Sequence, residues 1–221
     1  MTNQEAILLM QLLKGGRRPD IAIFYDGVNE SLVGGFSPGI PTAHWNFELI
    51  KTKFEKPAAS KLDCLNLSYS SKLIRLMMSP TQDNQQTMSD GDLAARAEAT
   101  LLNYEANLKL VQILAKAYGF HTYFFWQPVL AYGDKPLVPF ERKLAEAAGP
   151  EQGGRVHRGL KAVYRQAESR AAVTRAFVFL GRAFDQVGEP IYVDEFHLDS
   201  RGNELIAQLI AQRVRLGASS E

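Results

Sequence analysis

The sequence predicts an α/β fold in which a parallel sheet lies between two layers of helices, a three-layer α/β/α arrangement. Short apolar runs of strand length alternate along the chain with longer segments of helical periodicity, which is the pattern of βαβ units. The first of these runs stops at a polar loop, and in open α/β sheets ligands bind where the strands end. A length of 221 residues fits a single domain over residues 1–221.

Helical periodicity is clear over residues 3–14, about 91–118 and about 200–216. Gly119 is placed to cap the end of the second helix, and Asp199 or Ser200 to cap the start of the third. The second helix has an apolar stripe at spacings of three and four, formed by Leu101, Tyr104, Leu108, Val111, Ala115 and Tyr118. On the third helix one face carries Leu205, Ile206, Leu209, Ile210 and Val214.

Strands are predicted over residues 20–25, 122–126, 176–180 and, more briefly, 191–193. The first is a nearly continuous apolar run, which is typical of a parallel strand buried on both faces. The remaining segments are expected to be a loop over 31–60 with a short helix near 45–53, a helix over 61–78, a polar insertion loop over 79–90, and a loop with helices over 136–172.

Composition excludes several classes of protein. The net charge is +1 and no basic stripe is present, which argues against a nucleic-acid partner. Cys64 is the single cysteine, so neither an intrachain disulfide nor a Cys-rich zinc site can form. The apolar runs are too short to span a membrane. We expect no cofactor.

Two polar loops that follow predicted strands carry residues suited to acyl transfer. The first contains Gly27 and Asn29, and the second contains Asp194 and His197. A histidine that acts as a general base needs a carboxylate to fix its tautomer and to stabilise the imidazolium, and Asp194 is three residues away. An asparagine amide near the same place can donate a hydrogen bond to an oxyanion.

These loops resemble conserved blocks of the SGNH (GDSL-type) hydrolase superfamily. Gly27-Val28-Asn29-Glu30 after a buried strand is similar to the third block, usually Gly-x-Asn-Asp. Asp194-Glu195-Phe196-His197, followed by Gly202-Asn203 and an apolar helix, resembles the fifth block, Asp-x-x-His. Residues 18–29 are especially similar to bacterial members. The resemblance covers both ends of the chain, and the middle only through the order of its elements.

The resemblance implies an SGNH/flavodoxin-like fold and a role for each matched residue. His197 is then the general base, Asp194 orients it, and Asn29 and Gly27 belong to the oxyanion hole. Glu30 stands where the family usually has Asp. The implied activity is hydrolysis of an acyl ester of a small molecule or a carbohydrate.

One departure from the family pattern concerns the nucleophile. In the family, a Gly-Asp-Ser block with the nucleophilic serine precedes the Asn block, but only 28 residues precede Asn29 here and none forms Gly-Asp-Ser. The resemblance therefore implies an N-terminally incomplete fold in which two strands are missing, including the one beside residues 20–25. We expect the chain to be inactive or nearly so, and its exposed sheet edge to promote dimerisation or aggregation.

Ser37 offers an alternative nucleophile, because Gly35-Phe36-Ser37-Pro38-Gly39 matches the Gly-x-Ser-x-Gly elbow of α/β-hydrolases. The elbow uses the backbone N–H of the residue after the serine, and Pro38 has none. A non-catalytic binding or scaffold domain that kept the fold is a second alternative.

The candidate site residues also have simpler interpretations. His197 fits a residue that stabilises the last helix, Asp194 with His197 fits a metal site although no further ligand has a recognisable spacing, and Asn29 fits a residue that stabilises a turn. Gln127, at the end of the predicted strand 122–126, is a candidate pocket residue, and its neighbour Trp126 is expected in the core.

Overall fold

The computed structural model describes residues 1–36, 88–147 and 154–218. All of these except Met88 belong to one compact unit that combines both ends of the chain, residues 1–43 and 89–221. The expected helices near 45–53 and over 61–78, the Ser37 motif and residues 79–87 of the expected polar insertion lie outside the described residues.

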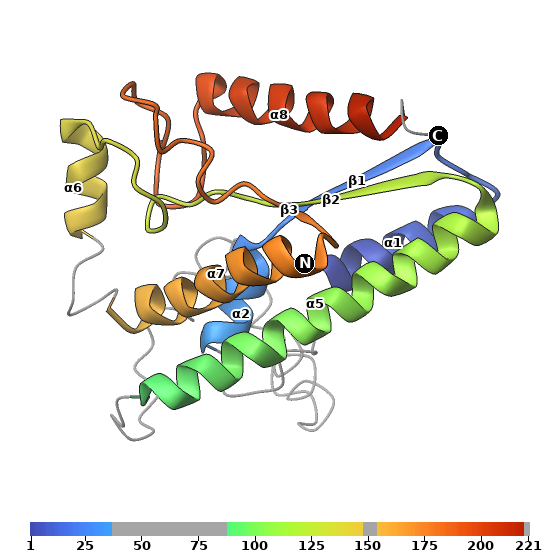
Figure 1. Ribbon diagram of the computed structural model, residues 1–221, viewed down its shortest axis with the longest axis horizontal. Coiled ribbons are helices and arrows are strands. Elements are labelled where there is room, and N and C mark those ends of the chain that lie inside the picture. The colour runs from blue at the N-terminus through green and yellow to red at the C-terminus, as the bar shows by residue number, and fades with distance from the viewer. Residues whose placement is uncertain (37–87, 148–153, 219–221) are drawn as a thin grey trace, which may run out of the picture. The chain divides into compact units, whose positions relative to one another are not determined.

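The described part is a mixed α/β structure with a parallel sheet, so the general α/β class is confirmed (Figure 1). Its elements are α1 (Thr2–Lys14), β1 (Ile21–Asp26), α2 (Val28–Phe36), α5 (Asp90–Tyr118), β2 (His121–Trp126), α6 (Pro139–Ala147), α7 (Gly154–Thr174), β3 (Val178–Phe179) and α8 (Ser200–Ala218). None of the helices in these ranges combines the length and the apolar composition needed to cross a bilayer.

The three described strands form one parallel sheet in the order β1-β2-β3. Phe24 lies opposite Phe124, Asp26 opposite Trp126, and Trp126 opposite Phe179. Because all three strands run in the same direction, the loops that follow them leave the sheet at the same edge. That edge is where the candidate residues are expected.

Alternate side chains of β2 enter two separate cores. Phe124 and Trp126 pack with residues of α1, α5 and α7, whereas Phe125 packs with Ile206 of α8. Figure 1 shows α8 on one side of the sheet and α1, α5 and α7 on the other. A strand that is apolar on both faces is therefore explained by helices on both sides.

The long helix α5 follows its sequence signals closely. Ser89 and Asp92 form a reciprocal capping box at its start, and Gly119 ends it with a left-handed φ of 73°. The predicted stripe is buried from Leu101 to Ala115, but Tyr118 in the last turn is exposed.

Several sequence predictions are wrong in detail. Residues 28–36 form helix α2 rather than the start of a loop, because Val28 and Leu32 are buried in the core and the first turn is capped. Only Val178 and Phe179 of the predicted strand 176–180 form a strand.

The prediction that the first strand is buried on both faces is also wrong. Ile21 and Ile23 of β1 are 44% and 49% exposed. Within the described residues β1 has a strand neighbour on one side only, and the core formed with α8 reaches Tyr25 of this strand but neither isoleucine. The exposed sheet edge that the sequence predicts is therefore present in the described part.

This edge is expected to drive self-association. In light scattering, the apparent mass of the chain should rise with concentration, and Ile23→Lys should lower that rise because a charged side chain disfavours edge pairing. Val173→Lys on α7, where the valine is 83% exposed, is the matched control. A wild-type chain that stays monomeric at every concentration contradicts the expectation.

Candidate functional site

The candidate base and its carboxylate form a preorganised turn. Asp194 Oδ1 accepts hydrogen bonds from the backbone N–H groups of Phe196 and His197, both at 2.8 Å. Asp194 Oδ2 lies 2.7 Å from Nδ1 of His197. One carboxylate thus closes the turn and orients the ring, which is what the Asp-x-x-His spacing predicts.

The electrostatics of this pair suit a general base. Partial burial raises the pKa of Asp194, but the hydrogen bonds from the Phe196 N–H, the His197 ring and the His197 N–H outweigh it and hold the pKa below its usual value. An ionised Asp194 accepts a hydrogen bond from Nδ1–H, so in the neutral ring Nε2 carries no proton. The His197 side chain is 76% exposed, which leaves that nitrogen accessible.

The turn closes a short antiparallel loop. The Val193 N–H donates to the His197 carbonyl at 3.0 Å, and the Asp199 N–H donates to the Ile191 carbonyl at 2.7 Å. Asp199 also caps α8 by accepting from the Gly202 N–H at 2.7 Å. The cap of the last helix is therefore Asp199 rather than His197.

A buried carboxylate on α6 anchors the strand-like segment that enters this loop. Glu141 Oε1 accepts from the N–H groups of Ile191 and Tyr192 at 2.9 and 3.1 Å. Its Oε2 accepts from Lys135 Nζ at 2.6 Å and from the Val138 N–H at 3.2 Å. Burial raises the pKa of Glu141, but the hydrogen bonds from these four donors lower it by more. The net pKa therefore lies below its usual value. No sequence pattern pointed to this residue.

The second candidate loop is held by Glu30 rather than by Asn29. Glu30 Oε2 accepts from the Gly27 N–H at 3.0 Å, while its Oε1 accepts from the N–H and hydroxyl of Thr2, both at 2.7 Å. Ser31 donates through its N–H and its hydroxyl to the Gly27 carbonyl. A Glu three residues after the helix cap is a recognised capping signal, so sequence reasoning had the means to find this contact.

Gly27 is required by its surroundings. Its φ of 127° is one that L side chains rarely adopt, and a Cβ would lie 2.9 Å from the Trp126 indole. An oxyanion would have to compete with Glu30 for the Gly27 N–H. Asn29 is exposed in the first turn of α2, and its side chain has no hydrogen-bond partner within the described ranges. The amide of Asn29 is therefore available to a ligand.

Asp26, which sequence reasoning missed, lies buried directly before Gly27. Burial, followed by the negative charges of Glu30 and Glu5, raises the pKa of Asp26 to about 9. The carboxyl is therefore protonated at neutral pH. Glu30 is local, but burial and the charge of Glu5, which lies on α1, cannot be inferred from the local sequence.

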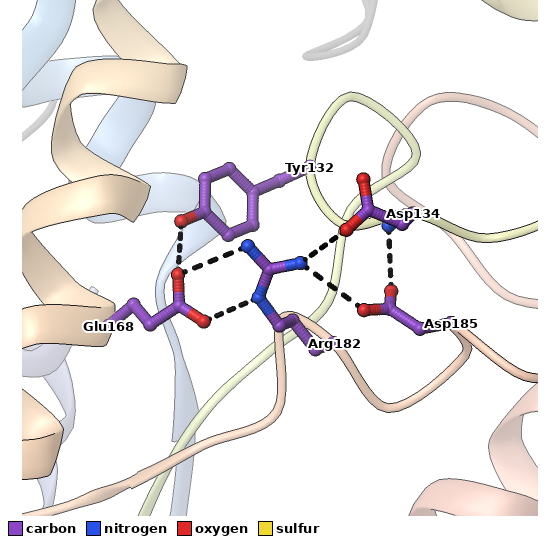
Figure 2. Close-up of polar contacts among 5 residues, drawn as sticks. All are labelled: Tyr132, Asp134, Glu168, Arg182 and Asp185. Carbon is purple, nitrogen blue, oxygen red and sulfur yellow. Dashed lines mark hydrogen bonds and ion pairs between the residues drawn. The ribbon is translucent and has the colours of Figure 1, made fainter.

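The loops after β2 and β3 are joined to α7 by an ionic network (Figure 2). Arg182 pairs with Glu168, with Asp134 at 2.7 Å and with Asp185 at 3.3 Å. Tyr132 lies under the guanidinium and donates to Glu168 at 2.6 Å. The network fixes two of the loops at the edge that carries the candidate residues.

Hydrogen bonds connect the candidate segments in series along this edge. The Gln127 N–H donates to the Asp26 carbonyl at 2.7 Å, and the Leu130 N–H donates to the Glu195 carbonyl at 3.1 Å. The Gln127 carbonyl accepts from Tyr164 at 3.0 Å. The structure thus pairs Asp194 with His197 directly, and it links the end of β1 to that turn through the loop after β2.

Two further findings bear on the interpretation of the site. Among the described residues, no group of three or more His, Cys, Asp or Glu side chains is placed to hold a metal ion. Comparison with protein-family models and with curated proteins finds no match for this chain.

Glu141→Gln is expected to destabilise the fold by about 2–5 kcal/mol, because the neutral side chain leaves Lys135 without its buried partner. Folding lowers the pKa of Glu141, so its carboxylate contributes to the free energy of unfolding. This contribution is fully present above the pKa of the unfolded chain and is lost as the pH falls through the pKa of the folded chain. In urea denaturation, the free energy of unfolding of Glu141→Gln should lie below that of wild type by the whole amount at pH 7. The difference should shrink toward pH 3. Exposed Glu146→Gln on the same helix is the control, and equal stability of the two variants at pH 7 would refute the anchoring role.

Proposed function

We propose that this chain is an SGNH-like domain of three layers that supplies the acid–base part of a serine ester hydrolase. Its substrate is an acyl ester of a small molecule or a carbohydrate. The observation that carries the proposal is the 2.7 Å contact between Asp194 Oδ2 and His197 Nδ1, with the other Asp194 oxygen held by two backbone N–H groups.

Each residue has one role in this proposal. His197 Nε2 takes the proton of a serine hydroxyl while the serine oxygen attacks the ester carbonyl carbon, and the carbonyl electron pair moves onto its oxygen. The Asn29 amide donates to that oxyanion. When the oxyanion collapses, the alcohol leaves with the proton from His197, and water then cleaves the acyl-enzyme by the same steps.

The position of the site supports the proposal. Asn29 follows β1, Gln127 follows β2, and the 194–197 turn bonds to the loop after β2 through Leu130. All of them lie at the carboxyl end of the parallel strands, where open α/β folds bind ligands. Gln127 is half-buried there and remains a candidate for contact with substrate.

The nucleophile is the remaining component. The 221 residues contain no Gly-Asp-Ser block, and Ser37 lies outside the described residues. In this proposal the serine comes from outside the 221 residues. The chain alone is then expected to retain only the small residual acceleration that binding and an oxyanion hole provide.

A fluorogenic short-chain ester tests the proposal on the 221-residue chain and on a form extended upstream by the sequence of its own gene. The extended form should turn over the ester. We expect His197→Ala to lower kcat by at least about 10³-fold and Asn29→Ala by about 10²–10³-fold. His121→Gln is the control, because His121 is exposed at the opposite end of β2.

Two outcomes would overturn the proposal. Turnover by the 221-residue chain that Ser37→Ala abolishes would assign the nucleophile to Ser37. An extended form that carries a Gly-Asp-Ser block but turns over none of a panel of acyl esters would favour a binding or scaffold domain.

A further inference from the structure

The residue between Asp194 and Phe196 connects the candidate turn to a distant helix. Glu195 Oε2 lies 3.0 Å from Nε2 of His157, which is in the first turns of α7. The two side chains are 30% and 19% exposed, so both are more buried than Asp194 and His197. A ring N–H that donates to a carboxylate in a partly buried setting holds better than an ion pair in open solvent.

The backbone of the same residue makes a second connection. The Glu195 carbonyl accepts from the Leu130 N–H at 3.1 Å, in the loop after β2. At the base of the loop, the bonds between Val193 and His197 and between Ile191 and Asp199 hold its two arms together. These base bonds set the width of the loop, and the Phe196 side chain packs against the core near its tip. At the tip, Glu195 makes polar contacts with two other parts of the described chain, one through its backbone and one through its side chain.

We infer that His157 is a positioning residue, which acts through Glu195 to fix the orientation of the Asp194–His197 pair. The importance of that orientation for catalysis rests on the function proposed above. The physical reason is that a mostly exposed imidazole keeps a single direction only if the turn that carries it is held from outside. A misplacement of about 1 Å can cost on the order of 10²-fold in rate.

The alternative is that the His157–Glu195 pair is a surface contact without influence on His197. The two cases differ in the state of the His197 ring. In the positioned turn the ring proton stays on Nδ1, bonded to Asp194. Glu195 lies between Asp194 and His197 in the chain, so loss of its outside contact lets the backbone between them change conformation and weakens this bond. The neutral ring then moves toward the Nε2–H tautomer that free imidazole side chains prefer.

Nitrogen-15 NMR of the histidine side chains of the 221-residue chain measures this state directly. The sequence contains four histidines, so single substitutions assign each signal. At pH 7.5 the wild-type His197 should show a protonated Nδ1 and an unprotonated Nε2. In His157→Ala and in Glu195→Ala, the Nδ1–H signal should be lost and the ring should become a mixture of tautomers.

Two matched variants sharpen the test. Glu195→Gln retains an oxygen acceptor for the His157 ring and should keep the wild-type His197 spectrum. Glu189→Ala removes an exposed carboxylate that pairs with Arg201 and should also leave His197 unchanged. The double variant His157→Ala/Glu195→Ala should resemble either single variant, because both remove the same contact.

An unchanged His197 spectrum in both folded alanine variants overturns the inference. The spectrum does not depend on turnover, so it separates this inference from the proposed function. If no form of the protein hydrolyses esters but the His197 signal is lost as described, the positioning role stands and the proposed function fails. If the extended form is active, His157→Ala and Glu195→Ala should each lower kcat about 10-fold or more with little change in KM, whereas Glu195→Gln should retain the wild-type kcat.

Discussion

The buried carboxylate of Glu141 is the constraint on which the position of the candidate site depends. It is inaccessible to solvent, and its oxygens accept from the backbone N–H groups of Ile191 and Tyr192. Those two residues carry the chain out of the core into the loop that presents Asp194 and His197. A buried charge is tolerated only when it is paired and fully hydrogen-bonded. Ile191 and Tyr192 must therefore keep their N–H groups directed at Glu141, which fixes the course of this segment. The exposed turn thus starts from a rigid anchor.

The buried acid before the Gly27 turn, Asp26, has the opposite ionisation state to Glu141. Asp26 is surrounded by Glu30 and Glu5 and has a pKa raised to about 9, whereas Glu141 is surrounded by donors and has a lowered pKa. Glu141 is therefore charged and Asp26 neutral at pH 7, although both are buried. The difference follows from their partners. The charged Glu141 accepts hydrogen bonds from backbone N–H groups. The neutral Asp26 places no buried charge beside the Gly27 turn, which packs against Trp126.

Local features of the fold and site were predictable because short-range chemistry determines them. The Asp-x-x-His spacing closes a turn by itself, and the Gly119 cap depends only on a left-handed φ that glycine adopts readily. The burial of Trp126 followed from an apolar strand in a parallel sheet. Helix α2 was missed because its glycines and polar residues resemble a loop, and its stability comes from burial of Val28 and Leu32 and from Glu30.

Long-range contacts were not predictable from the sequence. Glu141 lies 50 residues before Ile191, and His157 lies 38 residues before Glu195. In the sequence Glu141 is one of two acids on α6, and His157 is a histidine among basic residues. Only packing reveals which polar side chain meets which backbone group. For this reason the sequence indicated the residues of the candidate chemistry but not the residues that hold them in place.

The proposed acyl transfer requires the Asn29 amide and the Asp194–His197 pair to face one another across the end of the sheet. The side-chain amide signal of Asn29, followed by NMR while the pH is moved through the range in which histidines titrate, about 5 to 8, tests it most directly. We predict that the Asn29 signal shifts together with the protonation of His197 and that the shift disappears in His197→Gln. An Asn29 signal that is insensitive to the state of His197 would contradict the account.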